Sequence, residues 1–218
     1  MKIKPMFSNW LRLLFFACIV RPLTWVVLGI NIRHQARLPQ KGPAIIVANH
    51  NSHLDTLVLM SLFPLKQLPQ LRPVAAADYF LRNRIVAWFA LKIIGIIPIT
   101  RHVKKDQDPF ADIYTALSKG SIIILFPEGT RGEPERMSKF KNGVARLGQH
   151  IPDVPTIPIF LHGLGKALPK GEAVFVPFFC DVFVGEPFKW QGGKHEYMQH
   201  LDQAMQKLAN EGQFATWE

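Results

Sequence analysis

The chain has 218 residues, 48% of them hydrophobic, and a formal net charge of +10. This length suits one well-buried α/β domain with an appendage and is too short for two ordinary enzymes. Because Cys18 and Cys180 are the only cysteines, neither a disulfide framework nor a Cys-based metal site is expected, and a reducing, cytoplasmic setting fits best.

The positive charge is concentrated in the first half of the chain. Residues 1–105 contain fifteen Lys or Arg against two Asp, a net charge of +13, whereas the remainder has a net charge of −3. A basic region attracts nucleic acid or an anionic lipid surface. This region also has long apolar stretches and has no helix-turn-helix, zinc-finger or RNA-binding signature. We therefore expect an anionic membrane surface as a partner and no nucleic acid.

The first 32 residues contain two apolar octets, 13–20 and 23–30, separated by Arg21 and Pro22. As a helix, each octet measures only ~12 Å against a hydrocarbon core of ~30 Å, so neither can span a bilayer alone. One continuous span would place Arg21 near the bilayer centre and Pro22 inside the hydrogen-bond ladder. We therefore predict a membrane-associated helical pair within residues 1–32, two short helices lying in one leaflet.

The residues around these octets suit the surface of a bilayer. Trp10 and Trp25 fit the interfacial zone. Basic residues are expected to meet anionic head groups; they are Lys2, Lys4, Arg12, Arg33 and Arg37. Two alternatives stay open: a buried helical pair in a soluble protein, and a secretory signal, which the lack of a small-x-small cleavage site disfavours.

From residue 44 onward, apolar runs of strand length alternate with runs of helix length. The expected strand and helix pairs are 44–48 with 56–62, 73–77 with 80–94, 96–100 with 109–117, and 121–126 with 144–150. Further strands are expected at 154–161 and 173–184, and an amphipathic helix at 195–210. This alternation indicates an α/β sheet covered by helices on both faces, in which ligands bind where loops leave the carboxyl ends of strands.

The first polar loop after a strand carries His50 and Asp55, in the segment Asn49-His50-Asn51-Ser52-His53-Leu54-Asp55. On one ideal helix these two side chains would point about 140° apart, so they can meet only if His50 precedes the helix and Asp55 lies in its first turn. A carboxylate bound to one ring nitrogen fixes the tautomer and leaves the other nitrogen to accept a proton from a hydroxyl.

Three other interpretations of this loop remain open. Ser52 and Asp55 fit a variant of a helix-capping box, which leaves His50 without a role. His50 can also be a structural histidine at the end of a strand. Finally, His50, His53 and Asp55 are possible metal ligands of a metal-dependent hydrolase, although no second dense cluster of ligand residues accompanies them.

Cationic side chains follow two further strands. Arg131 comes after the strand 121–126 in Pro127-Glu128-Gly129-Thr130-Arg131, where Gly129 lets the backbone approach a ligand. Arg101 ends the strand 96–100, and Lys141 precedes a helix whose N-terminus favours anions. Together these cations predict a phosphate site.

These segments resemble the four sequence blocks of the glycerolipid acyltransferase family, and within it the bacterial lysophosphatidic acid acyltransferases. The blocks match in order at residues 49–55, 95–101, 126–132 and 154–159, and the resemblance covers about residues 40–165. Gly132 and the Pro98-Ile99-Thr100 stretch depart from the usual pattern, which puts acceptor preference in doubt rather than the chemistry.

The resemblance implies an acyltransferase catalytic domain in residues 33–218 at the cytoplasmic face of the inner membrane, monotopic or peripheral. It implies His50 as the base, Asp55 as its orienter, and an acceptor site made by Arg101, Glu128, Gly129, Thr130 and Arg131, with Lys141 as a further ligand. The implied acceptor is a lysophospholipid, most simply 1-acyl-glycerol-3-phosphate, and the donor is acyl-CoA or acyl-carrier protein. No cofactor or metal is expected. Backbone N–H groups of the His50 loop and of the Glu128-Gly129 turn are both candidate oxyanion donors, and the sequence does not choose between them.

Overall fold

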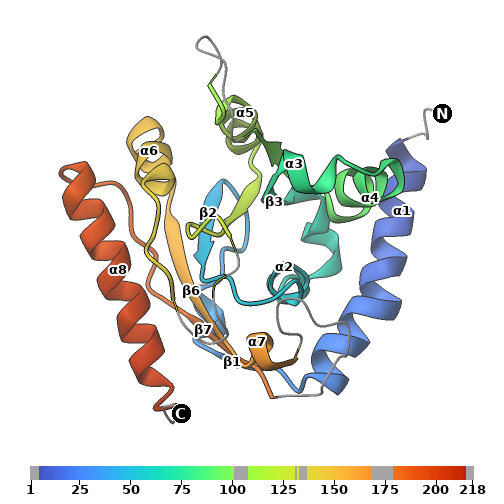
Figure 1. Ribbon diagram of the computed structural model, residues 1–218, viewed down its shortest axis with the longest axis horizontal. Helices are drawn as coiled ribbons and strands as arrows, with labels where there is room; N and C mark the ends of the chain where they lie inside the picture. The colour runs from blue at the N-terminus through green and yellow to red at the C-terminus, as the bar shows by residue number, and fades with distance from the viewer. Residues whose placement is uncertain (1–4, 101–107, 131, 133–136, 168–178, 215–218) are drawn as a thin grey trace.

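The computed structural model describes residues 5–100, 108–130, 132, 137–167 and 179–214. These residues form one seven-stranded sheet in the order β1-β7-β6-β2-β5-β3-β4, with helices on both sides of it (Figure 1). The strands are β1 (Asn31–Arg33), β2 (Ala44–Ala48), β3 (Leu71–Ala76), β4 (Ile97–Ile99), β5 (Ile122–Leu125), β6 (Thr156–His162) and β7 (Asp181–Val184). All neighbours are parallel except β6 and β7. The predicted α/β class is confirmed.

The helices follow the strands as the sequence predicts, with several short additional turns. They are α1 (Pro5–Phe15), η1 (Phe16–Val20), η2 (Leu23–Val27), η3 (Gln35–Arg37), α2 (Leu54–Ser61), η4 (Leu65–Gln70), α3 (Ala77–Phe80), α4 (Arg84–Phe89), η5 (Ala90–Ile94), α5 (Ala111–Ser118), α6 (Gly143–His150), α7 (Leu164–Ala167) and α8 (Lys194–Glu211).

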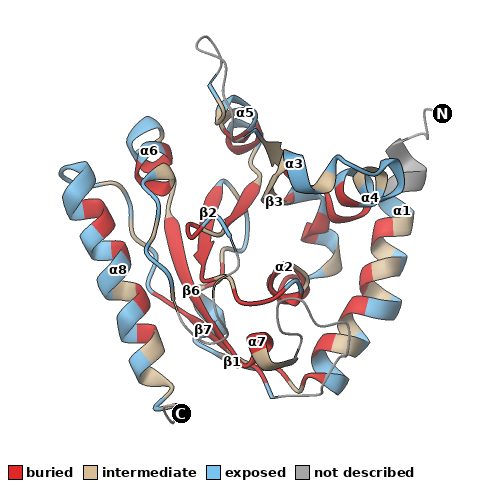
Figure 2. Cartoon of the chain, in the orientation of Figure 1, coloured by how far each residue is buried: buried red, intermediate tan, exposed pale blue. Residues whose placement is uncertain are grey.

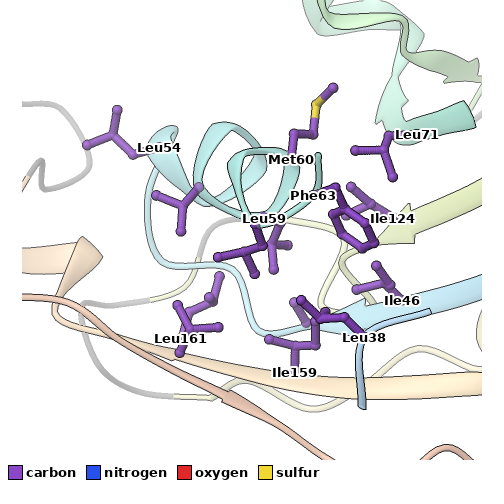
Figure 3. Close-up of a cluster of buried hydrophobic side chains, with 14 of the residues drawn as sticks. Leu38, Ile46, Leu54, Leu59, Met60, Phe63, Leu71, Ile124, Ile159 and Leu161 are labelled. Carbon is purple, nitrogen blue, oxygen red and sulfur yellow. The ribbon is translucent and has the colours of Figure 1, made fainter. Parts of the chain in front are cut away.

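Two layers of apolar side chains cover the sheet, because successive residues of a strand face opposite sides. In β2, Ala44, Ile46 and Ala48 belong to the cluster that includes α1, η1 and α2, whereas Ile45 and Val47 belong to the cluster beneath α5, α6 and α8. Figure 3 shows the side chains of α2 packed over β2, β5 and β6. All five residues of β2 are buried, as a central parallel strand requires.

The two N-terminal octets form one helix rather than the two predicted helices. The helix continues through Pro22 because i to i−5 bonds form on both sides of it: Arg21 N–H donates to the oxygen of Phe16, and Leu28 N–H to that of Leu23. These wider turns accommodate a residue that lacks an N–H group. In the described chain, Asn9–Val27 is the one helix with the length and apolar composition to cross a membrane.

One side of this helix packs on the domain. Phe16, Val20 and Leu28 lie in the same core cluster as α2 and the sheet. Arg12 is buried and donates to the backbone oxygens of Leu71 and Ile94, 3.0 Å each, so its expected role at lipid head groups is wrong.

The other basic residues expected to meet lipid head groups are Lys2, Lys4, Arg33 and Arg37. Arg37 donates to the oxygen of Val184 at 3.0 Å and pairs with Glu186, so its charge is already neutralised by the protein. Lys2 and Lys4 lie outside the described residues. Only Arg33 is exposed as predicted, with its guanidinium 5.4 Å from the ring centre of Phe183.

Three later elements also differ from the sequence prediction. The expected helix 80–94 is interrupted, because Asn83 Oδ1 accepts from Ile85 N–H at 2.8 Å and so caps a new helix, α4. The helix expected at residue 109 begins at Ala111, although Asp108 does accept from Phe110 N–H at 2.9 Å. Of the strand expected at 173–184, residues 173–178 lie outside the described part, and β7 begins at Asp181.

Candidate active site

The His50 and Asp55 side chains, which the spacing predicts to meet, lie in contact at the carboxyl end of β2. His50 Nδ1 lies 2.8 Å from Asp55 Oδ2. His50 precedes α2 and Asp55 is in its first turn, which is the arrangement that lets them meet. The imidazole is 21% exposed, whereas the carboxylate is fully buried. Within the described chain Nε2 has no hydrogen-bond partner, so it is the ring nitrogen available to a substrate proton.

Asp55 also holds the loop that carries His50. Its Oδ2 accepts from the backbone N–H groups of Asn51 at 2.7 Å and Ser52 at 2.8 Å. Ser52 Oγ accepts from Leu54 N–H at 3.3 Å, whereas the N-cap of α2 is His53, whose side chain makes no capping bond. Asp55 Oδ2 therefore closes the loop and orients the imidazole.

Both buried carboxylates of the site have perturbed acidity. Burial raises the pKa of Asp55, and the bonds from His50, Ser52 and Asn51 act against that rise. Burial also raises the pKa of Glu128, again opposed by hydrogen bonds from neighbouring N–H groups. Such shifts are common where carboxylates serve a catalytic centre.

Glu128 joins the turn after β5 to the loop after β2. One carboxylate oxygen accepts from His50 N–H at 2.9 Å, and the other accepts from Ser138 N–H at 3.3 Å. Only 4% of Glu128 is exposed. The neighbouring parallel strands β2 and β5 place these two loops side by side. Glu128 therefore contacts the backbone of His50.

Two residues that were not singled out from the sequence complete the setting of His50. Asn49 is buried, and its amide pairs with the backbone of Leu161 in β6, accepting at 2.7 Å and donating at 2.8 Å. Phe126 stacks on the imidazole at 4.2 Å between ring centres. The sequence offers one signal for each residue: Asn49 directly precedes His50, and Phe126 directly follows β5. These signals do not identify the contacts, because Leu161 is more than 70 residues from Asn49 and His50 is more than 70 residues from Phe126.

The predicted phosphate site is partly described. Lys141 lies over the turn after β5: its N–H donates to Pro127 at 2.9 Å, and a Cβ on Gly129, whose φ is +75°, would overlap its ammonium group. Thr130 is exposed beside them. Arg101 and Arg131 lie outside the described residues.

Four of the candidate oxyanion donors are already engaged by the protein. The N–H groups of His50, Asn51 and Ser52 bind carboxylates, and that of Gly129 donates to Phe126 at 3.1 Å. In this structure these four N–H groups hold their own loops rather than facing a substrate.

The metal-site alternative requires His53 beside His50 and Asp55. His53 instead points to Tyr79, with ring centres 6.2 Å apart. Among the described residues no group of three His, Cys, Asp or Glu side chains is arranged to hold a metal ion.

Comparisons with known proteins point to one family. The family model described as Acyltransferase matches residues 29–162. A chloroplastic 1-acyl-sn-glycerol-3-phosphate acyltransferase of Arabidopsis thaliana is 33% identical over 66% of this chain and 38% of its own length. A 1-acyl-sn-glycerol-3-phosphate acyltransferase of Pseudomonas aeruginosa is 28% identical over 94% of this chain and 75% of its own.

The fold is similar to a crystal structure of a 1-acyl-sn-glycerophosphate acyltransferase from Thermotoga maritima. The two chains superpose with a TM-score of 0.77 at 19% identity, covering all of this chain and 86% of the other. At that identity the likeness concerns the fold. The chain spans less than half the length of the first plant relatives it matches.

Proposed function

This chain belongs to the acyltransferase family, and on that premise we propose that it acylates the free hydroxyl of 1-acyl-glycerol-3-phosphate to give phosphatidic acid. The observation that carries the proposal is the bond between His50 and the buried Asp55 at the carboxyl end of β2. This pair suits a hydroxyl acceptor, because a hydroxyl is too weak an acid to attack without a base at neutral pH. The donor is a fatty acyl thioester, acyl-CoA or acyl-carrier protein.

The reaction needs no acyl-enzyme. The acceptor oxygen attacks the thioester carbonyl carbon while His50 Nε2 takes the hydroxyl proton, and Asp55 stabilises the resulting imidazolium. The tetrahedral intermediate then breaks its carbon–sulfur bond. The departing thiolate takes the proton from His50, so the products are the ester and a free thiol.

The acceptor phosphate is assigned to Arg101, which follows β4 in the sequence, and to Arg131 and Lys141, which follow β5. Lys141 supports this assignment through its place over the Glu128-Gly129 turn, next to the His50 loop. Arginine binds phosphate with two parallel hydrogen bonds, so each Arg would fix orientation as well as charge. Glu128 is assigned a positioning role instead, since both of its oxygens hold backbone N–H groups.

The protein is proposed to work at an anionic membrane surface through exposed apolar residues of two segments. All large exposed hydrophobic side chains of the described residues except Phe179 lie on the N-terminal helix or on α3–η5, and we call them the apolar surface: Trp10, Leu14, Ile19, Trp25, Val26, Val27, Tyr79, Leu81, Ile85, Val86, Phe89 and Leu91. Figure 2 shows the exposed sides of α1 and α4 next to each other. A patch of this kind on a water-soluble domain marks an interaction surface.

The apolar surface reaches the catalytic loop. Phe15 of the first helix packs edge-to-face on Phe89, 5.1 Å between ring centres, and Tyr79 stacks toward His53. The exposed cations Arg82, Arg84 and Lys92 are interspersed in α3–η5. A lysolipid therefore has a path from an anionic bilayer to His50 along α3 and α4.

A panel of lysolipids tests this function. Purified protein would be given each lysolipid with acyl-CoA and, separately, with acyl-carrier protein, and the products would be identified by mass. We expect phosphatidic acid from 1-acyl-glycerol-3-phosphate, no product from His50→Ala, and a raised acceptor KM with an unchanged donor KM in Arg131→Ala. Turnover by His50→Ala at the wild-type rate would contradict the mechanism.

A further inference from the structure

A cavity lies at the opposite end of α2 from the loop that carries His50. Its volume is about 580 Å³. Its walls come from the C-terminal half of the first helix, the turn before β2, and the segment that follows α2. The residues that line it are Arg21, Trp25, Gln35, Leu38, Pro39, Gln40, Ser61, Leu62, Phe63, Pro64, Leu65 and Gln67.

Arg21 is the single charged side chain among the residues lining this cavity, and the three wall segments, residues 21–25, 35–40 and 61–67, contain no acidic residue. One Arg21 nitrogen donates to the oxygen of Phe63 at 2.9 Å. Its Nε is buried and has no hydrogen-bond partner in the described chain. A guanidinium has five N–H donors in a planar fork, so this one has capacity left for an anion.

Gln67 supplies a complementary acceptor. It is only 8% exposed, and its amide nitrogen donates to the backbone oxygen of Gln40. Its Oε1 is buried with no partner among the described residues. A buried acceptor left unpaired is costly, so the cavity is suited to an occupant that brings a hydrogen-bond donor.

We propose that this cavity binds the head group of a membrane glycerophospholipid whose phosphate is esterified to an alcohol with a hydrogen-bond donor. The phosphodiester binds Arg21, and the donor of the head-group alcohol binds Gln67. Trp25 lines the cavity, and Val26 in the same turn is 80% exposed, so the acyl chains extend along the apolar surface. That the head group belongs to a membrane lipid rests on the membrane attachment proposed above. The chemistry of the head group itself rests only on Arg21 and Gln67.

Calorimetric titration of the full chain with short-chain lipids below their micelle concentration tests this site. We expect saturable binding of dihexanoylphosphatidylglycerol and weaker binding of dihexanoylphosphatidylcholine, whose quaternary ammonium has no N–H. Arg21→Gln should lower the affinity for dihexanoylphosphatidylglycerol about tenfold or more, since a hydrogen bond to a charged group is lost. The matched control is Lys66→Gln, which removes an equal charge beside the cavity without lining it, and should change affinity less than about twofold.

A second variant keeps the test decisive if Arg21→Gln unfolds. Gln67→Met is close in size and removes the acceptor that binds the head-group donor, so it should weaken the binding of phosphatidylglycerol and bring it close to that of phosphatidylcholine. Glycerophosphoglycerol, the deacylated head group, should bind more weakly than the lipid; equal affinity would overturn the lipid source. No saturable binding to the wild-type protein, or an equal loss in Lys66→Gln, would overturn the site. These titrations need no acyl donor, so a failure of acyl transfer leaves their outcome unaffected.

Discussion

Asn49 connects the stability of the sheet to the position of the catalytic base, and removing its amide should affect both. In Asn49→Ala, the N–H and the oxygen of Leu161 lose bonds of 2.7 and 2.8 Å inside a buried strand, and the oxygen keeps only the 3.5 Å bond from the Asn51 amide. Each buried backbone group left unpaired costs about 1–3 kcal/mol, so we expect the free energy of unfolding to fall by about 2–5 kcal/mol. For a chain of this size, each kcal/mol lowers Tm by about 2–4 °C.

The same variant should also slow the chemical step. His50 follows Asn49 directly, and a displacement of about 1 Å at a reacting group can cost about a hundredfold in rate. We therefore expect kcat to fall about ten- to hundredfold with little change in either KM. Circular dichroism during heating and steady-state kinetics measure the two effects separately.

Asn31 offers a matched control, because its amide donates to Asp181 at 2.8 Å on the exposed edge strand β1. Asn31→Ala should change the free energy of unfolding by less than about 0.5 kcal/mol and leave kcat unaltered. If Asn49→Ala lost stability but kept its wild-type kcat, the amide would support the fold without positioning His50. An unchanged Tm would refute the hydrogen-bond reasoning itself.

Three further predictions concern other parts of the molecule. Glu128→Gln should lower kcat without raising the acceptor KM, because the side chain holds the backbone of His50; a raised acceptor KM with normal kcat would instead place Glu128 on the substrate. Ile19→Ser combined with Val26→Ser should weaken co-sedimentation with anionic vesicles about tenfold or more and leave Tm unchanged, and undiminished sedimentation would exclude these residues from the membrane contact. Burial raises the pKa of Asp55 in the folded state above its ordinary value of 3.8, so between pH 3.8 and the raised pKa this group binds more protons in the native protein than in the unfolded chain. The contribution of Asp55 to the stability of the wild type therefore falls as pH rises from 3.8 to the raised pKa. Asp55→Asn lacks this contribution, so urea unfolding should show its stability rising relative to the wild type from pH 4 toward neutrality; parallel pH dependences would contradict the shift.

The parts of the fold that local pattern governs were predictable from the sequence. β2, α2, α6 and α8 lie within two residues of the predicted ranges, because their apolar periodicity and their bounding polar residues are local signals. The pairing of His50 with Asp55 was also predictable, since only a loop followed by a helix lets a spacing of five residues close.

The remaining features depend on contacts between distant segments. Asn49 meets Leu161 only because β2 pairs with β6, and Glu128 meets His50 only because β5 lies on the other side of β2. The burial of Arg12 likewise depends on the carbonyl groups of Leu71 and Ile94. No local pattern reports which strands become neighbours. Continuation of the first helix through Pro22 was mispredicted for a different reason: a change to i to i−5 bonding leaves no mark in apolar periodicity.

The bonds from Arg12 to Leu71 and Ile94 make the first helix and the sheet a single rigid unit. A helix already ordered in this way has no folding entropy to lose when it enters a lipid layer, in contrast to a tail that folds on binding. On the membrane attachment proposed above, the depth and tilt of that helix in the bilayer would also set the height of His50 relative to the lipid head groups. Changes in lipid packing or bilayer thickness would therefore alter how readily an acceptor hydroxyl reaches the base, even with every catalytic contact intact.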